Sequence, residues 1–257
     1  MKKSLALLAL ILPVSAQAAA QTSDLVRFVS CPVYRDTDSG RKSGCWLADD
    51  RESGARYDVS LSPYKPDWNH ATLVEGRVAA APPTACGSTV LDPVRTSVLE
   101  APCPRHMLPA EGYAGRKFVL PPRNITPNAV PRKVVAGPFA ARTFAVFFEF
   151  DRSFLVYQYG DYLLEQAANW LEAAKPKRIV VTGYAATRPE TVSGQVLAEH
   201  PDIAAERAET IAESLRRLLP EATIETATAL DAEVTDLPDA DGIPGQSQRR
   251  VEIRAEF

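Results

Sequence analysis

A proline-dense stretch divides this sequence into two unlike halves. Proline lacks a backbone donor and fixes φ, so a high density of it breaks helices and central strands and favours an extended connection. We therefore predict a linker at 119–141, with one globular unit at 21–118 and a second at 142–257. The stretch contains Pro121, Pro122, Pro127, Pro131 and Pro138.

The charge balance changes at the same place. The whole chain of 257 residues has a net charge of −3. Residues 24–133 carry 15 basic and 12 acidic side chains, whereas residues 134–257 carry 12 basic and 20 acidic ones. Because the charge is low and acidic overall, nucleic acid is not expected as a partner. With 46% hydrophobic residues, the chain can build packed cores.

The first twenty residues predict a secretory signal peptide. Lys2 and Lys3 precede an apolar run at 5–14, and the small residues at 16–20 fit a signal-peptidase site. This run is shorter than the roughly 20 apolar residues that cross a bilayer, and no later stretch reaches that length. We therefore expect an exported, periplasmic chain without a transmembrane span, and association with the outer membrane stays open.

Four cysteines, all in the first half, predict disulfides. Export to an oxidising compartment favours disulfides over free thiols, and the even count leaves no cysteine over. Three pairings are possible, and the one between sequence neighbours closes loops of about 15 residues. A catalytic thiol, such as Cys86 with His106, is disfavoured because no protease-like sequence flanks it. The cysteines are Cys31, Cys45, Cys86 and Cys103.

The first half predicts a small, disulfide-clamped β domain. Short runs of β-branched and aromatic residues alternate with clusters of Gly, Pro, Asp and Ser. A barrel or a sandwich fits this pattern, and its role as a binding module or a spacer stays open. The predicted strands are Leu25–Cys31, Cys45–Ala48, Tyr57–Leu61, Thr72–Val78 and Thr89–Leu99.

The second half alternates strands and helices. Hydrophobic periodicity predicts a helix at 161–174 and a second helix that starts after Asp202 as N-cap and ends at Pro220. Strands are predicted at 142–150, 178–184, 223–229 and 250–257. This order predicts an α/β sandwich with a mixed sheet covered by helices on one face, and an α+β fold for the whole chain.

Four strings in the second half, together with this element order, resemble the OmpA-like domain, a family of peptidoglycan-associating modules. The resemblance covers about 115 residues, 142–257, and the last string is the most specific. The strings are Phe148-Glu149-Phe150-Asp151, Val181-Thr182-Gly183-Tyr184, Glu206-Arg207-Ala208-Glu209 and Gln248-Arg249-Arg250-Val251-Glu252-Ile253.

The resemblance implies a ligand site with one departure. In the family, an Asp and an Arg hold the ammonium and the carboxylate of diaminopimelate in the wall peptide. Arg207 matches the Arg, but Ala186 stands where the Asp belongs. A guanidinium forks onto a carboxylate through two charge-assisted hydrogen bonds, whereas an unmatched ammonium weakens binding. The implied wall-peptide residues are Arg207, Gly183, Tyr184, Gln248 and Arg249.

The segment after Ala186 is longer than the family's usual connection and contains three acidic residues. Glu190, Glu199 and Asp202 all lie between Thr187 and Ile203. One of them is a candidate substitute for the missing Asp. The ordinary alternatives are solvation for the glutamates and helix capping for Asp202.

Motifs of catalysis and of metal binding are not found. The three histidines lack metal-ligand spacing, and the sequence has no nucleophile elbow, phosphate loop or dinucleotide fingerprint. We therefore expect a non-enzymatic envelope protein without cofactor or metal that associates with peptidoglycan through an atypical site. The alternative is an OmpA-like fold that has lost the wall ligand and serves protein–protein assembly in the envelope. A hydrolase in the first half is the least favoured class.

Overall fold

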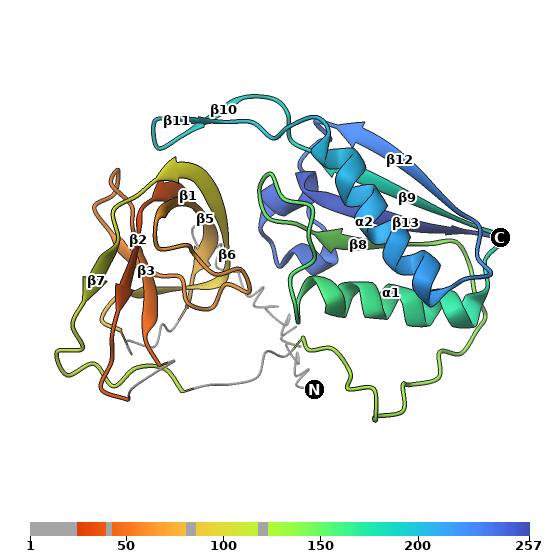
Figure 1. Cartoon of the computed structure of the whole chain (residues 1–257), viewed down its shortest axis with the longest axis horizontal. Coiled ribbons are helices and arrows are strands. Elements are labelled where there is room, and N and C mark those ends of the chain that lie inside the picture. Colours follow the sequence, from red (N-terminus) through yellow and green to blue (C-terminus); the bar gives the residue numbers. More distant parts are fainter. Residues whose placement is uncertain (1–24, 40–42, 81–85, 118–122) are drawn as a thin grey trace, which may run out of the picture.

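The computed structural model describes residues 25–39, 43–80, 86–117 and 123–257. The predicted signal peptide lies outside these residues. Among the described residues, no helix is long and apolar enough to cross a bilayer. The whole chain has the predicted α+β character, with few helices and mixed sheets (Figure 1).

The first half forms one curved sheet of seven strands in the order β1-β5-β6-β4-β3-β2-β7 (Figure 1). Antiparallel pairs β1–β5 and β5–β6 make one side, and β2, β3 and β4 make the other. Buried apolar residues from both sides, such as Val74 and Tyr57, pack in one core cluster. The strands are β1 Leu25–Ser30, β2 Pro32–Arg35, β3 Cys45–Asp49, β4 Arg56–Asp58, β5 His70–Val78, β6 Thr89–Pro102 and β7 His106–Leu108.

Two disulfides clamp this sheet, but not between sequence neighbours. Cys31 is joined to Cys103 across 72 residues, and Cys45 to Cys86 across 41. The first bridge joins the chain just beyond β1 to the chain just beyond β6. The two short loops of about 15 residues are therefore not formed, because strand order rather than sequence distance brings the cysteines together.

The second half is a four-stranded mixed sheet in the order β12-β9-β13-β8, with two helices on one face (Figure 1). β12 runs parallel to β9, and β13 runs antiparallel to both β9 and β8. A separate hairpin, β10–β11, projects from the connection between β9 and α2. The elements are β8 Arg142–Phe147, α1 Gly160–Ala174, β9 Arg178–Ala185, β10 Glu190–Val192, β11 Gln195–Leu197, α2 Ile203–Leu218, β12 Ile224–Leu230, two short 3₁₀ turns at Pro238–Ala240 and Pro244–Gln248, and β13 Arg250–Glu256.

The main core lies between this sheet and its helices. Leu171 of α1 and Ile211 of α2 pack on inward-facing residues of the central strands, such as Val181 and Ile253. The apolar stripe of each helix therefore faces the sheet as predicted. Asp202 occupies the N-cap position of α2, but its side chain makes no capping hydrogen bond.

β8 is shorter than the predicted strand at 142–150. After Phe147 the backbone departs from β13 towards the first half within three residues. The Phe148 N–H donates to the Arg249 carbonyl, and the Phe150 N–H donates to the Ser97 hydroxyl, 3.0 Å away in β6. The string Phe148-Glu149-Phe150-Asp151 therefore lies in a loop between the halves and not in the strand.

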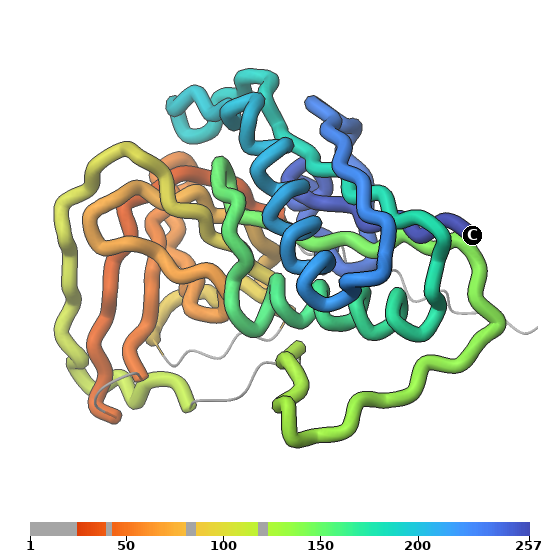
Figure 2. The backbone as a smooth tube through the Cα atoms, turned by 45° about the vertical axis from the view of Figure 1, so that its right-hand side comes forward, coloured from red at the N-terminus to blue at the C-terminus, as the bar shows by residue number. Residues whose placement is uncertain are grey.

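The predicted linker lies along the second half. Residues 119–122 are outside the described residues, and 123–141 contain no helix or strand. This part of the chain runs around the second half before it enters β8 (Figure 2). Arg132 pairs with Glu165 of α1 at 3.0 Å, and Phe139 makes an edge contact with Trp170. The described part of this stretch is therefore packed against α1.

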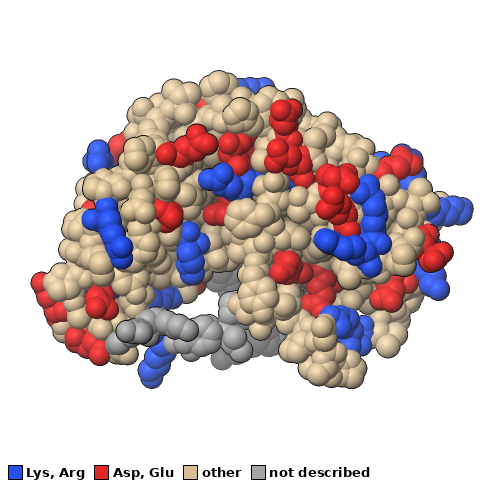
Figure 3. Space-filling model, in the orientation of Figure 1, with Lys and Arg blue, Asp and Glu red and all other residues tan. Residues whose placement is uncertain are grey.

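Buried polar contacts join the two halves. Glu75 of β5 pairs with Arg249, and both side chains are buried. Arg95 of β6 donates to Asp241 at 2.6 Å and to the Tyr159 hydroxyl at 2.9 Å. On the outer face in Figure 3, acidic and basic side chains are interspersed. Buried charged side chains therefore pair across the junction of the halves.

Candidate functional site

Arg207 occupies the centre of the candidate site, and its guanidinium is fully used. It lies in the second turn of α2 with an exposed fraction of 0%. A guanidinium has five N–H donors. Each has an acceptor here, so none is left for a ligand. The acceptors are the carbonyls of Arg152 (2.8 Å), Tyr184 (2.8 Å) and Glu149 (2.9 Å) and the two carboxylate oxygens of Glu199 (2.5 and 3.0 Å).

Glu199 is the acid that faces Arg207. Its carboxylate accepts the forked pair from Arg207 and two backbone N–H groups, those of Asp151 at 2.7 Å and Ala186 at 2.8 Å. The Glu199 side chain is as buried as that of Arg207. A buried ion pair is stable only when its remaining hydrogen-bonding groups are satisfied, and this pair meets that condition.

This arrangement differs from an open clamp. Of the three acids in the long connection, Glu199 reaches the site, Glu190 pairs with Arg27 instead, and Asp202 stays at the helix start. Glu199 does not stand beside an open groove to receive an ammonium. Its carboxylate binds the guanidinium where the resemblance implies the carboxylate of the wall peptide.

The hairpin that precedes Glu199 is held by the first half. Val192 and Leu197 pack with Val29, Leu73 and Leu99 in one buried cluster. The Ser193 hydroxyl accepts the Val29 N–H at 3.1 Å. The curved sheet therefore fixes the segment that carries Glu199 into the site.

Gly183 and Tyr184 lie at the end of β9, beneath α2. A Cβ on Gly183 would come within 1.9 Å of the Ala204 carbonyl oxygen, so glycine permits the close approach of strand and helix. Tyr184 gives its carbonyl to Arg207, while its hydroxyl donates to Glu252 at 2.9 Å and its ring stacks on Arg250. Gly183 and Tyr184 therefore both make contacts within the fold.

Gln248 and Arg249 bind partners other than Arg207. The Gln248 amide donates to the Ala232 carbonyl at 3.0 Å. Arg249 pairs with Glu75 of the first half. Of the five residues implied by the resemblance, only Arg207 and the backbone of Tyr184 meet at one point.

The Glu75 carboxyl is a buried acid with two cationic partners. Burial raises the pKa of a carboxyl, but Arg249 and Arg27 outweigh this effect and hold the pKa of Glu75 below its ordinary value. Glu75 is therefore ionised at neutral pH. The specific string around Arg249 serves the junction between the halves in this chain.

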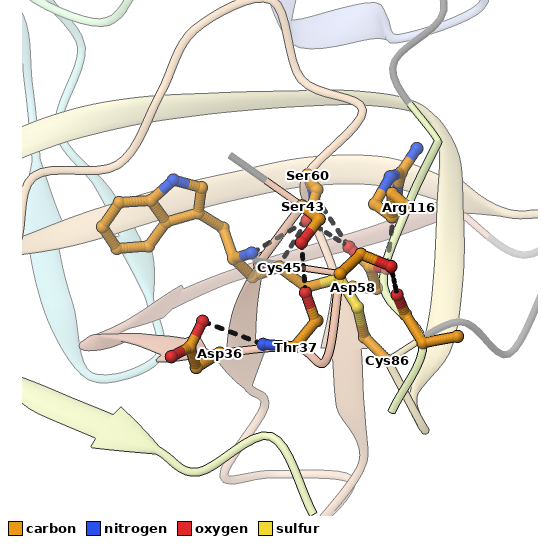
Figure 4. Close-up of a disulfide and its surroundings, with 11 residues drawn as sticks. Asp36, Thr37, Ser43, Cys45, Asp58, Ser60, Cys86 and Arg116 are labelled. Atoms are coloured by element: carbon orange, nitrogen blue, oxygen red, sulfur yellow. Dashed lines mark hydrogen bonds and ion pairs between the residues drawn. A yellow bond between two sulfur atoms is a disulfide. The ribbon is translucent and has the colours of Figure 1, made fainter. Parts of the chain in front are cut away.

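Cys45, Asp58 and Cys86 lie close enough to suggest a metal site, but both sulfur atoms belong to one disulfide. Figure 4 shows Asp58 beside this bridge, directed at Ser60 and Arg116. Its carboxylate accepts the Ser60 hydroxyl at 2.6 Å and lies 3.4 Å from Arg116. Because a disulfide offers no thiolate, the group is a structural clamp with a satisfied acid.

Sequence reasoning gave no role to two buried acids, Glu75 and Glu149. The available signal for Glu75 was an acidic residue within the apolar run of a predicted strand. Glu149 stands in the same position relative to Phe148 and Phe150. Whether an acidic residue between apolar residues of a strand is buried depends on the parts of the fold that pack around it, which the local sequence does not show.

No family model matches the sequence, and no curated protein matches it. Several solved structures are similar to part of it. The OmpA-like domain of FopA1 from Francisella tularensis subsp. tularensis SCHU S4 is 18% identical, with a TM-score of 0.34, over 45% of this chain and 71% of that one. The cell wall anchor of the T6SS from Pseudomonas aeruginosa is 21% identical, with a TM-score of 0.34, over 45% and 81%. The periplasmic domain of MotB is 13% identical, with a TM-score of 0.32, over 54% and 90%.

Proposed function

We propose that this chain is a non-catalytic protein of the cell envelope and that its second half is a domain of the peptidoglycan-associating type. The four strings and the order of elements support this proposal, and two disulfides suit an oxidising compartment. The similar structures are titled as an OmpA-like domain, a cell wall anchor and a periplasmic domain. A periplasmic setting is part of the proposal.

Within this setting, the pairing of Arg207 with Glu199 carries the finer proposal, which is a role in protein–protein assembly. All five donors of Arg207 already have acceptors. An external carboxylate can bind there only by displacing Glu199, which leaves a buried charge unpaired. The domain therefore keeps the fold while its arginine is occupied by the chain itself.

The first half explains why Glu199 occupies Arg207. It holds the β10–β11 hairpin through the buried cluster around Val192 and Leu197. We propose that the two halves act as one rigid body that partners recognise, with linker residues 123–141 packed along its side. The domain limits given by the sequence, 21–118 and 142–257, belong to this proposal.

Direct wall binding at Arg207 is the second candidate, supported by the match of Arg207 to the motif. Sedimentation with purified sacculi separates the two. We expect the wild-type chain to stay in the supernatant and, in intact envelopes, to crosslink to a defined protein. Sedimentation of the wild type that is lost in Arg207→Lys, but kept in the exposed control Arg216→Lys, would establish wall binding instead.

A further inference from the structure

A hollow between the two halves is separate from the Arg207 pair. It has a volume of about 360 Å³. One wall comes from the loop before β5 and from β6, and the other comes from the loop that follows β8. Glu149 and Arg152 bring charge to the second wall. The apolar lining residues are Pro63, Pro66, Val98, Phe154 and Val156.

Glu149 is a buried acid whose carboxylate is not bonded to any other described residue. Its exposed fraction is 7%, and its carboxylate makes no hydrogen bond or ion pair with any residue in the described ranges. Its main chain, in contrast, is fixed: its carbonyl accepts from Arg207 and from the Arg152 N–H. Its carboxylate oxygens are not fully enclosed, and a largely buried acid without a hydrogen-bonding partner at the wall of a hollow points to a ligand.

The second unpaired charge in the hollow is Arg152. Its guanidinium makes no hydrogen bond or ion pair with the described part of the chain, although it is near enough to act on Glu149 through its charge. The other charged lining residues are occupied. Lys65 donates to the carbonyls of Ser60 and Ser62, and Asp67 pairs with His70.

These observations define the chemistry of a ligand. Glu149 would accept an ammonium, Arg152 would bind a carboxylate, and the proline, valine and phenylalanine side chains would contact an apolar stem. We infer that the hollow binds a small zwitterion, an α-amino acid or a peptide end with an apolar side chain. The site uses neither Arg207 nor Glu199 as a ligand contact, so it goes beyond the proposed function.

Phe154 supports this assignment. It lines the hollow, yet more than half of its surface is exposed. A large aromatic side chain at the rim loses exposed surface when an apolar stem enters.

Calorimetric titration of the full chain with three probes at pH 8, where the Glu149 carboxyl is ionised, tests the inference. L-norleucine carries both charges, n-pentylamine carries only the ammonium, and hexanoate carries only the carboxylate. We expect norleucine to bind most tightly and hexanoate most weakly. No binding of norleucine at millimolar concentration, or binding of either singly charged probe as tight as that of norleucine, would overturn the zwitterion site.

Two variants locate the binding. Glu149→Gln keeps the shape of the side chain and should weaken norleucine binding about tenfold or more, because it removes a charge-assisted contact. Glu213→Gln makes the same chemical change on the exposed face of α2 and should leave the affinity unchanged. Far-ultraviolet circular dichroism checks that both variants fold. Equal affinity of the wild type and Glu149→Gln would contradict the assignment.

Discussion

The carboxylate of Glu199 lies in the fork of the Arg207 guanidinium, at 2.5 and 3.0 Å, with both side chains buried. Removing one member leaves the other charge without its partner in the interior. We expect Glu199→Ala to lower the free energy of unfolding by about 3–5 kcal/mol. Urea denaturation measures this loss.

The control for this prediction is an exposed pair on the same helix. Glu209 and Arg216 are 2.5 Å apart and solvent-exposed. Glu209→Ala should cost less than about 1 kcal/mol, because water replaces the lost contact. Equal losses at the buried and the exposed pair would show that Glu199 is not an essential internal partner of Arg207.

A second prediction concerns Gly183. Because a Cβ there would lie 1.9 Å from a backbone oxygen of α2, Gly183→Ala must displace the helix. We expect a loss of about 3 kcal/mol or more of stability, at the upper end of the cost of overpacking. In Gly137→Ala the new Cβ meets the Phe139 ring at 3.3 Å and its backbone nitrogen at 3.4 Å, far looser contacts than at Gly183, so this control should change stability by less than about 1 kcal/mol. Thermal unfolding of both variants distinguishes them.

Glu149 predicts an unusual dependence of stability on pH. Burial raises the pKa of its carboxyl to about 7, and the nearby Arg152 only partly opposes this. Since the folded state holds the proton more tightly than the unfolded state, the contribution of Glu149 is fully present below the ordinary pKa of 4.5 and is lost as the pH rises through about 7.

Glu149→Gln isolates this effect. It should stabilise the chain at pH 8 by up to about 3 kcal/mol relative to wild type, and much less at pH 5. Denaturant unfolding of both proteins at the two pH values gives the difference. A difference that does not grow between pH 5 and pH 8 would contradict the raised pKa.

The disulfide pairing can be tested by mass spectrometry of tryptic peptides. Tryptic digestion without reductant should link peptide 28–35 to 96–105 and peptide 43–51 to 78–95, because Cys31 bridges Cys103 and Cys45 bridges Cys86. Links between 28–35 and 43–51 would indicate the neighbouring pairing instead. On a chain-entropy argument each bridge contributes about 4 kcal/mol, so reductant should shift the unfolding midpoint markedly.

Local patterns in the sequence determined much of this protein. The periodicity of the second half predicted both helices and their sheet, since an apolar stripe of period 3.6 and an alternation of period 2 report which face is buried. Proline density predicted a linker at 119–141, and its described part, 123–141, contains no helix or strand. The strings around Arg207 named it as a candidate ligand residue but did not predict its burial.

Only the tertiary structure decided what Arg207 binds. Glu199 reaches it because a hairpin that the sequence did not reveal packs on β1, more than 160 residues earlier in the chain. Strand order likewise chose the disulfide partners, and the junction of the halves buried Glu75 and Glu149. Which side chains are buried and which of them pair depends on neighbours that are distant in sequence. The pattern of residues alone could therefore name the three candidate acids but could not choose among them.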